Sequence, residues 1–461
     1  MARHHPHLDP GYVASQLDAP ARADPRAHRL HVAAAAFLCF FVGFPVSFVE
    51  IASIPLFVIG LFRLRRTYRT ALSFGAQPLF LVVVAWMVWH GLSIRWSPDP
   101  AQGWREFGNC RWFWVTFMLW PVARARPVLI AALAAGLLCG AASQVVNALG
   151  HATGARWLML TPNADRNAGW WEPIVGGTLL TAGLGLHLPA ALMGRGRERL
   201  IACAGAVVML SGVIATGTRG AWIASAGLLA IVGAVAAVRS LRRGSRGEPK
   251  SAVRAVLAWG LAAVVVAGLV WLLAGSAIGR RVEQARTDLA AAARGEYRTD
   301  TGARLLMWTW AIREASARPL TGVGAGGFRA WARAHAADYG EDAASQPLHT
   351  HAHSAPLQIA ATTGLVGVVL AGLVMGIAVR GGLRELGPAG DEGGREAGGW
   401  WGARGGIGSY AAGPGFALIG MALAGLFDPI HQTTITGAWL AILMGLCLVG
   451  RPTPLVRAPA S

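Results

Sequence analysis

Three histidines stand at alternate positions, His349, His351 and His353, directly before a long apolar segment that contains Gly364 and Gly367. A cluster in this place lies where a membrane helix meets water. Imidazole titrates near neutral pH and can take a proton from an alcohol, so a catalytic base acting on a lipid-embedded substrate is one interpretation. The cluster could instead be a polar helix entry, or alternate histidines could share a metal ion, although no carboxylate or cysteine stands directly beside them.

Two arginines are candidates for binding a phosphate group. Arg219 lies in the sequence Thr-Gly-Thr-Arg-Gly-Ala-Trp, between two apolar segments, where a charge is costly unless it is paired or functional. Arg304 and Trp308 fall on one face of a helix predicted at 303–316 by their i, i+4 spacing. The planar guanidinium group binds phosphate oxygens through two hydrogen bonds. The alternative for Arg219 is a side chain that snorkels to lipid headgroups.

Three further features could line the same site. The glycines at 321–328 could bring backbone N–H groups close to a phosphate, although a Gly-rich turn after a helix is the simpler interpretation. Asp428 and His431 lie in a short connection between two apolar segments and could face the site or merely form a polar turn. Trp222 closely follows Arg219 and is a candidate to line the same cavity.

The composition indicates a membrane protein. The chain has 461 residues, of which 54% are hydrophobic and 14% are charged, with a mean hydropathy of +0.45. A soluble protein carries about 25% charged residues. The net charge of +18 comes almost entirely from arginine, and the basic inner loops of a membrane protein explain it without nucleic acid. The five cysteines form no CxxC pair, so neither a zinc cage nor a disulfide framework is indicated.

Apolar segments predict an all-α polytopic protein with about twelve transmembrane helices, each near the ~20 residues that a bilayer requires. The predicted spans are 31–47, 49–63, 77–94, 107–122, 127–149, 173–193, 199–216, 220–238, 253–274, 355–379, 410–427 and 433–449.

Arginine clusters follow every second predicted span, which places those loops and both termini in the cytoplasm. Arg219, the histidine cluster and the largest loop then share the opposite, periplasmic side. The predicted organisation is a cytoplasmic tail (1–30), nine spans (31–274), a large, partly helical periplasmic loop (275–353), three spans (354–450) interrupted by a flexible Gly-rich cytoplasmic loop (381–408), and a cytoplasmic tail (451–461).

The spacing after the histidine cluster resembles the signature of the O-antigen ligase and polymerase superfamily. That signature is a histidine, then Asn, Ser or Gln, nine residues and Gly-x-x-Gly, and His353-Ser354 with Gly364 and Gly367 matches it. The next position, Val368, departs from many members, which carry a small, hydroxyl or tyrosine residue there. This departure affects the assignment to a subfamily rather than the expected chemistry.

Two other motifs strengthen the resemblance. Thr218-Arg219-Gly220 is similar to the family's Thr-Arg-Gly turn between two spans. Arg304, Trp308 and the stretch 319–324 are similar to its loop pattern of arginine, three residues, tryptophan and then Pro-Leu-x-Gly-x-Gly. The resemblance extends over about residues 205–370, and elsewhere it is architectural.

The resemblance implies a GT-C-like helical fold and glycan transfer from an undecaprenyl-diphosphate carrier in the periplasm. It implies that His353 is the base that activates the acceptor hydroxyl, and that Arg219 and Arg304 bind the diphosphate. The expected reaction is inverting and needs no metal or other cofactor. In the ligases of this family the acceptor is a sugar of lipid A-core, so the expected partners are the lipid-linked donor, this acceptor and membrane lipids.

We therefore predict an O-antigen ligase of the bacterial inner membrane. An O-antigen or exopolysaccharide polymerase is the nearest alternative, because the motifs overlap, and a protein O-oligosaccharyltransferase is less favoured. A transporter would favour charged or broken helices near the middle of the membrane and an internal repeat. The sequence shows neither pattern, and its charges gather at the predicted rim.

Overall fold

The computed structural model describes residues 10–161, 167–244, 275–276, 278–339, 351–386 and 410–448. No strand occurs within these ranges. The predicted span at 253–274, His349 and the linker beyond residue 386 lie outside them. The helices are α1 (Pro10–Ala23), α2 (Pro25–Phe41), α3 (Val46–Gly75), α4 (Pro78–Ser93), α5 (Pro100–Gly108), α6 (Phe113–Leu119), α7 (Arg126–Thr153), α8 (Pro173–Met193), α9 (Gly196–Ala215), α10 (Arg219–Gly244), α12 (Asp300–Ala317), α13 (Phe328–Ala334), α15 (Ala355–Leu383), α16 (Gly413–Gly425) and α17 (Thr434–Leu448).

The predicted spans that fall in the described ranges are helical over most of their lengths. Seven helical segments in these ranges are long and apolar enough to cross a membrane, and α16 and α17 are shorter apolar helices. The chain is therefore a polytopic membrane protein. Several predicted boundaries were wrong, including that of the first span, which is α2 and ends at Phe41, and two others. The span predicted to end at residue 63 continues as α3 to Gly75, and the segment 107–122 is divided among α5, α6 and the 3-10 turns beside them.

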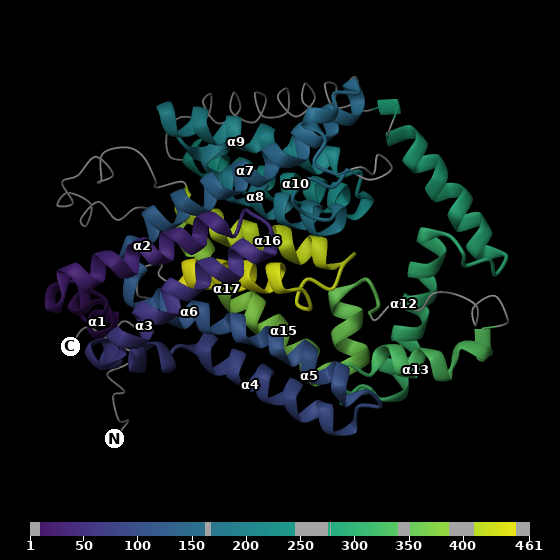
Figure 1. Ribbon diagram of the computed structural model, residues 1–461, viewed down its shortest axis with the longest axis horizontal. Coiled ribbons are helices and arrows are strands. Elements are labelled where there is room, and N and C mark those ends of the chain that lie inside the picture. The colour runs from purple at the N-terminus through teal and green to yellow at the C-terminus, as the bar shows by residue number, and fades with distance from the viewer. Residues whose placement is uncertain are drawn as a thin grey trace.

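Helix α8 forms the centre of the bundle. Its residues from Gly176 to Ala191 are all buried, and it packs against α9, α10 and α16 (Figure 1). Small residues allow this close packing, since a Cβ on Gly185 would lie only 2.5 Å from the Phe416 carbonyl oxygen. The first residues of α8 lie beside the turn that carries Arg219, so the central helix also supports the candidate site.

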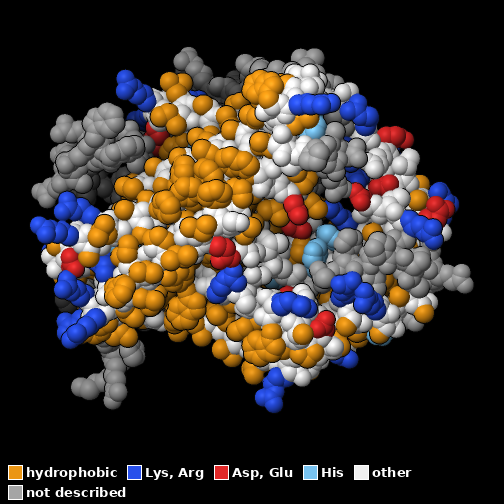
Figure 2. Space-filling model, viewed as in Figure 1, with side chains coloured by type: hydrophobic (Ala, Val, Ile, Leu, Met, Phe, Trp, Pro, Cys, Tyr) orange, Lys and Arg blue, Asp and Glu red, His pale blue; other side chains and the backbone are white. Residues whose placement is uncertain are grey.

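Apolar and charged side chains are separated along the bundle. Figure 2 shows a wide apolar band, with basic side chains gathered at its left edge and side chains of mixed charge at its right. Large hydrophobic side chains such as Phe62 and Leu200 are exposed, at 84% and 71% of their surface. A band of this kind is the surface that lipid covers. Helices α1 and α12 lie at its opposite ends (Figure 1).

Residues 278–339, here called the loop unit, contain α12 and α13. Its hydrophobic core is separate from that of the bundle and is built around Met307, Trp310 and Phe328. Two residues from outside the unit complete this core, Ala352 beside the histidine cluster and Ala361 in α15. The loop unit is therefore fixed to the segment that carries the histidines.

Helix α15 is interrupted at Gly364, where φ is 67° and ψ is −168°. The break releases carbonyl groups that a continuous helix would use, and the neighbouring elements pair with them. The backbone N–H groups of Val323 and Gly324, in the Gly-rich stretch of the loop unit, donate to the carbonyl oxygens of Ala361 and Thr362, each at 2.8 Å.

Two further hydrogen bonds complete the junction at the break. The indole Nε1 of Trp89, in α4, donates to the carbonyl oxygen of Thr363 at 2.8 Å. The N–H of Leu365 donates to the carbonyl oxygen of Pro319 at 2.7 Å. The broken helix, the loop unit and α4 are thus connected through the backbone groups that the break makes available.

Replacement of Gly364 by alanine should loosen this junction. An added Cβ would lie 2.3 Å from the Leu320 carbonyl, and the backbone conformation is one that only glycine adopts readily. We expect Gly364→Ala to cost roughly 1–3 kcal/mol of stability. The measurement is the thermal midpoint of the purified protein, together with the rate of proteolysis within the loop unit.

Gly376→Ala is the matched control for Gly364→Ala. It lies in the same helix, and no atom stands within 4 Å of its Cβ position. A Gly364→Ala protein with the midpoint and proteolysis rate of Gly376→Ala would show that the break is not needed for docking of the loop unit.

Candidate active site

The turn between α9 and α10 fixes Arg219 at the first position of α10. The hydroxyl of Thr218 donates to the carbonyl oxygen of Pro173 at the start of α8, at 3.0 Å. The indole Nε1 of Trp222 donates to the carbonyl oxygen of Val213 in α9, at 3.1 Å. Trp222, predicted to line the cavity, thus closes the turn through its indole nitrogen.

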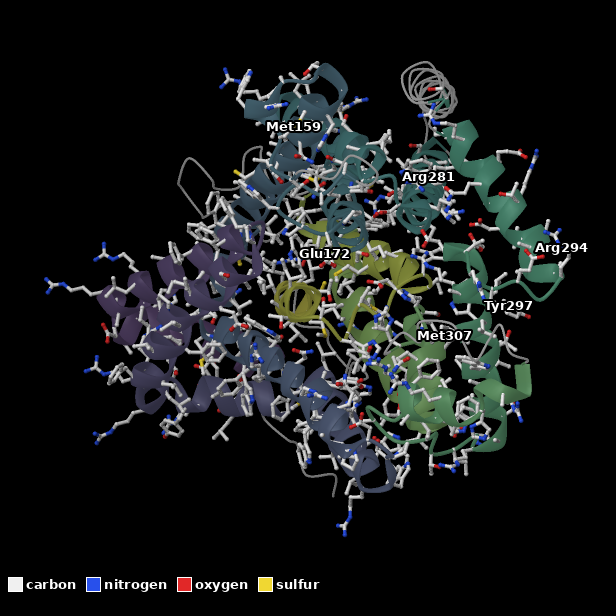
Figure 3. All side chains as sticks on the ribbon, turned by 45° about the vertical axis from the view of Figure 1, so that its right-hand side comes forward. Met159, Glu172, Arg281, Arg294, Tyr297 and Met307 are labelled. Atoms are coloured by element: carbon white, nitrogen blue, oxygen red, sulfur yellow. The ribbon has the colours of Figure 1, made fainter. Side chains whose placement is uncertain are left out.

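The guanidinium group of Arg219 is directed toward a buried carboxylate of the loop unit. Its Nη2 lies 3.8 Å from Oδ2 of Asp288, which is 5% exposed. The hydroxyl of Thr301, in the first turn of α12, donates to the same oxygen at 2.7 Å. Arg281, labelled in Figure 3, lies next to Gly217 of the turn. Helix α12, the helix at 278–293 and the Arg219 turn therefore meet at one point.

Arg304 faces a small pocket between α8, α10, α12 and the end of α16. Asp428 lies in this pocket and is 7% exposed. Burial raises the pKa of Asp428 to about 6, the positive charge of Arg304 opposes this rise, and the negative charge of Glu172 adds to it. Glu172 stands at the start of α8, near the centre of Figure 3. The other lining residues are Ile174, Thr178, Thr218, Gly220, Ala221, Ala424 and Phe427.

His353 is held in an unusual backbone conformation. Its φ is 49°, and it is the sole non-glycine residue with a positive φ in the described ranges. The conformation is fixed on both sides, because Ala352 is fully buried and Ser354 is the residue from which α15 begins. The side chain of Gln358 accepts a hydrogen bond from the N–H of Ala352 at 2.8 Å. Strain maintained in this way is typical of functional residues.

The segment that carries His353 packs against the connection that carries Asp428. A Cβ on Gly425, the last residue of α16, would lie 3.6 Å from Cβ of Ala355 and 3.2 Å from the side chain of Ile430. The start of α15 and the connection after α16 are therefore neighbours. The structure thus brings the predicted arginine, aspartate and histidine positions into one region at the end of α16.

Further histidines lie in the region of His351 and His353. The rings of His351 and His353 have their centroids 4.4 Å apart and lie edge to face. Burial lowers the pKa of His431 to about 3, with further lowering by the charges of His90 and His351, which places these side chains near one another. Histidine, acidic and basic side chains gather around a hollow at the margin of the apolar band in Figure 2. In the described ranges, no group of three or more His, Cys, Asp and Glu side chains is arranged to hold a metal.

The Gly-rich stretch is a structural turn, and its N–H groups are already used. Besides the two bonds to α15, Ala325 donates to the hydroxyl of Ser93 at 3.1 Å and Gly326 to the carboxylate of Glu106 at 3.2 Å. The N–H groups of Gly322 and Gly327 donate to carbonyl oxygens within the loop unit. The alternative interpretation of this stretch as a phosphate-binding loop was therefore wrong.

The remaining predicted residues have local roles or fall outside the description. Trp308 is half-buried on α12, one turn beyond Arg304. Gly367 is buried, and a Cβ there would collide with the Thr363 hydroxyl one turn earlier. His349 lies outside the described residues.

Residues 204–372 match the family model described as O-antigen ligase. This segment extends from α9 into α15 and contains the Arg219 turn, the loop unit and His353. This segment is therefore similar to the O-antigen ligase family. No curated protein matches the chain. The O-antigen ligase segment ends before α16. Asp428 and His431, in the connection between α16 and α17, therefore lie outside this segment but in the same region of the structure.

Two residues of the O-antigen ligase region were missed at the level of sequence. Asp288 stands in an exposed, highly charged helix, and nothing in that pattern distinguishes it from its neighbours. Gln358 belongs to an apolar helix, and its position in the helical period does not distinguish it from its neighbours. In the structure its side chain is fully buried, which does distinguish it. A polar residue in the first turns of an apolar span is the one clue that could have suggested it.

The sequence resemblance predicts that Arg304 binds a diphosphate, and the raised pKa of Asp428 would make such binding depend on pH. A bound anion disfavours the ionised carboxylate, so binding takes up a proton and affinity falls as the pH rises through about 6. Between pH 5 and pH 7.5 the affinity of the wild-type protein for farnesyl diphosphate should fall by roughly three- to tenfold more than that of Asp428→Asn. Isothermal titration of both proteins with the same ligand cancels the ionisation of the ligand itself. If the affinities of the wild type and Asp428→Asn depended on pH in the same way, Asp428 would not be part of the binding region.

Proposed function

We propose that this protein is an O-antigen ligase that transfers a glycan from undecaprenyl diphosphate to a sugar hydroxyl of lipid A-core. The proposal rests on one observation, the meeting of the Arg219 turn, Arg304 and the strained His353 at the end of α16. The family of residues 204–372 supports a transferase that acts on lipid-linked glycans. The choice of lipid A-core as acceptor is our proposal.

In the proposed reaction, His353 takes the proton of the acceptor hydroxyl while the hydroxyl oxygen attacks the anomeric carbon of the donor. The bond from that carbon to the diphosphate oxygen breaks, and undecaprenyl diphosphate leaves with the bonding electron pair. Attack from the face opposite the diphosphate inverts the anomeric configuration. Arg219 and Arg304 bind the diphosphate and stabilise its developing charge. Because guanidinium groups supply this stabilisation, the proposed reaction needs no divalent metal.

The supporting residues give this reaction a fixed geometry. Asp288 holds the guanidinium of Arg219 near the loop unit, and Gln358 holds the turn that precedes His353. A base held within hydrogen-bond reach of its substrate contributes about 10²–10⁴ in rate. The backbone strain at His353 costs of order 1–3 kcal/mol, and the surrounding structure holds the residue in this conformation.

A complementation experiment tests the proposal. In a bacterial strain without its own ligase, we expect His353→Ala, Arg219→Ala and Arg304→Ala to leave lipid A-core uncapped while lipid-linked O-antigen accumulates. Arg219→Lys should recover activity only in part, since an ammonium group lacks the paired geometry of guanidinium. The measurement is the lipopolysaccharide profile on a gel, with protein levels compared by immunoblot.

Arg294→Ala is the matched control for the arginine variants. It also lies in the loop unit, but its exposed side chain pairs with Glu296 at 3.3 Å, away from the turn. Normal capping in His353→Ala would reject the mechanism. Core that carries a single repeat would assign the protein to polymerisation instead.

We also propose that the site faces the periplasm and that both termini are cytoplasmic. The support is the basic surface at the opposite end of the bundle from the loop unit (Figure 2), where the side chains of Arg66 and Arg124 are exposed beside α1. In a background without the five native cysteines, Leu289→Cys should react with an impermeant thiol reagent in intact cells, whereas Leu241→Cys should react only after lysis. Both side chains are about half exposed, so a reversed pattern would reverse the topology.

A further inference from the structure

A second, apolar cavity lies on the other side of α16 from the arginines. Its volume is about 320 Å³, its walls come from α4, α6, α15, α16 and α17, and it opens beside the exposed Gly372 of α15. Typical lining residues are Trp86, Phe113, Val368, Gly372 and Leu440. Most of this lining is apolar and fits a hydrocarbon chain better than a sugar or a phosphate.

The cavity ends beside the candidate base. Ala355 and Pro356, the first two residues of α15 after His353-Ser354, form part of its wall. Its polar lining residues are Asn109 and His431. Since the pKa of His431 is lowered by burial, this side chain is neutral at physiological pH and does not place a charge against the hydrocarbon. A chain in the cavity would therefore hold its polar headgroup close to His353.

The short helix α16 separates the cavity from the arginine pocket. Ala424 lines the pocket that contains Arg304, whereas Ala422 and Gly425 line the apolar cavity. The pocket that contains Arg304 and the apolar cavity therefore lie on different faces of α16.

From this separation we infer that the cavity binds an acyl chain of the acceptor glycolipid. The inference rests on the proposed ligase function, in which both substrates are lipids and only one can occupy the arginine side. Binding of the chain places the acceptor sugar over His353 from the side opposite the diphosphate. The cavity is thus a recognition site for the acceptor and contributes to its KM rather than to the chemical step.

Two glycines of α15 allow a controlled test. Gly372 lines the cavity, whereas Gly376, one turn further, does not, and at both positions no atom stands within 4 Å of an added Cβ. Gly372→Phe should fill the cavity. The KM for acylated lipid A-core should then rise roughly tenfold, because the phenylalanine ring takes the place of part of the acyl chain and the apolar contacts of that part are lost. Gly376→Phe should keep the wild-type value.

A deacylated core oligosaccharide separates chain recognition from sugar recognition. For this acceptor, and for the lipid-linked donor, Gly372→Phe should have the same KM as the wild type, with kcat unchanged. Ala371→Phe enters the cavity from the preceding position and should reproduce the result, which guards against a folding defect specific to residue 372.

The alternative outcomes are distinct. An unchanged KM for the acylated acceptor in both cavity variants would mean that ordinary bilayer lipid fills the cavity, and would overturn the inference. A raised KM for the donor would assign the cavity to the prenyl chain and would also overturn it. Failure of the wild-type enzyme to use either acceptor would instead reject the ligase function, and the inference with it.

Discussion

The break in α15 at Gly364 is the constraint on which the arrangement of the site depends. An unpaired carbonyl group at the edge of a membrane is costly, so a broken helix survives only where other groups pair with it. Val323, Gly324 and Trp89 provide those groups. The break and the loop unit consequently require each other: without the loop unit the carbonyls are unpaired, and without the break the Gly-rich stretch has nothing to bind.

This dependence gives a physical reason for the spacing between the histidine and the glycines. His353 and Gly364 are eleven residues apart, which corresponds to about three turns at 3.6 residues per turn. His353 itself stands just before α15 in a left-handed conformation, so the helical period does not set the direction of its side chain. The loop unit instead holds this segment near both ends, because Ala352 precedes His353 and Ala361 lies about one turn before Gly364, and both enter the core of the loop unit. A change in the length of this segment would therefore displace either His353 or the break from its contact with the loop unit.

The sequence was sufficient to predict the helical membrane fold and the residues with strong chemical character. Arg219 and His353 could be chosen because a charge or an imidazole beside an apolar span is costly unless it has a function. Arg304 could be chosen from its i, i+4 spacing with Trp308 and from its similarity to the family's loop pattern. The Gly-rich stretch could not be interpreted in the same way. Its role depends on acceptors in distant segments, Ser93 and Glu106, and on carbonyl groups that exist only because α15 is broken. Contacts of this kind leave no periodic pattern in the chain.

Asp288 illustrates a second limit of sequence reasoning. Its partner Arg219 is distant in sequence, and the intervening chain includes a predicted span, so only the folded arrangement shows the pair. The same applies to the connection after α16. Asp428 faces the arginine pocket and His431 the apolar cavity, from positions three residues apart. A single short connection thus forms the boundary between a polar pocket and a hydrocarbon-lined one. Burial keeps His431 uncharged, whereas Asp428, with a pKa raised to about 6, is largely ionised at neutral pH beside the positive charge of Arg304. The connection therefore places its charge on the side of the arginines and leaves the side of the hydrocarbon uncharged.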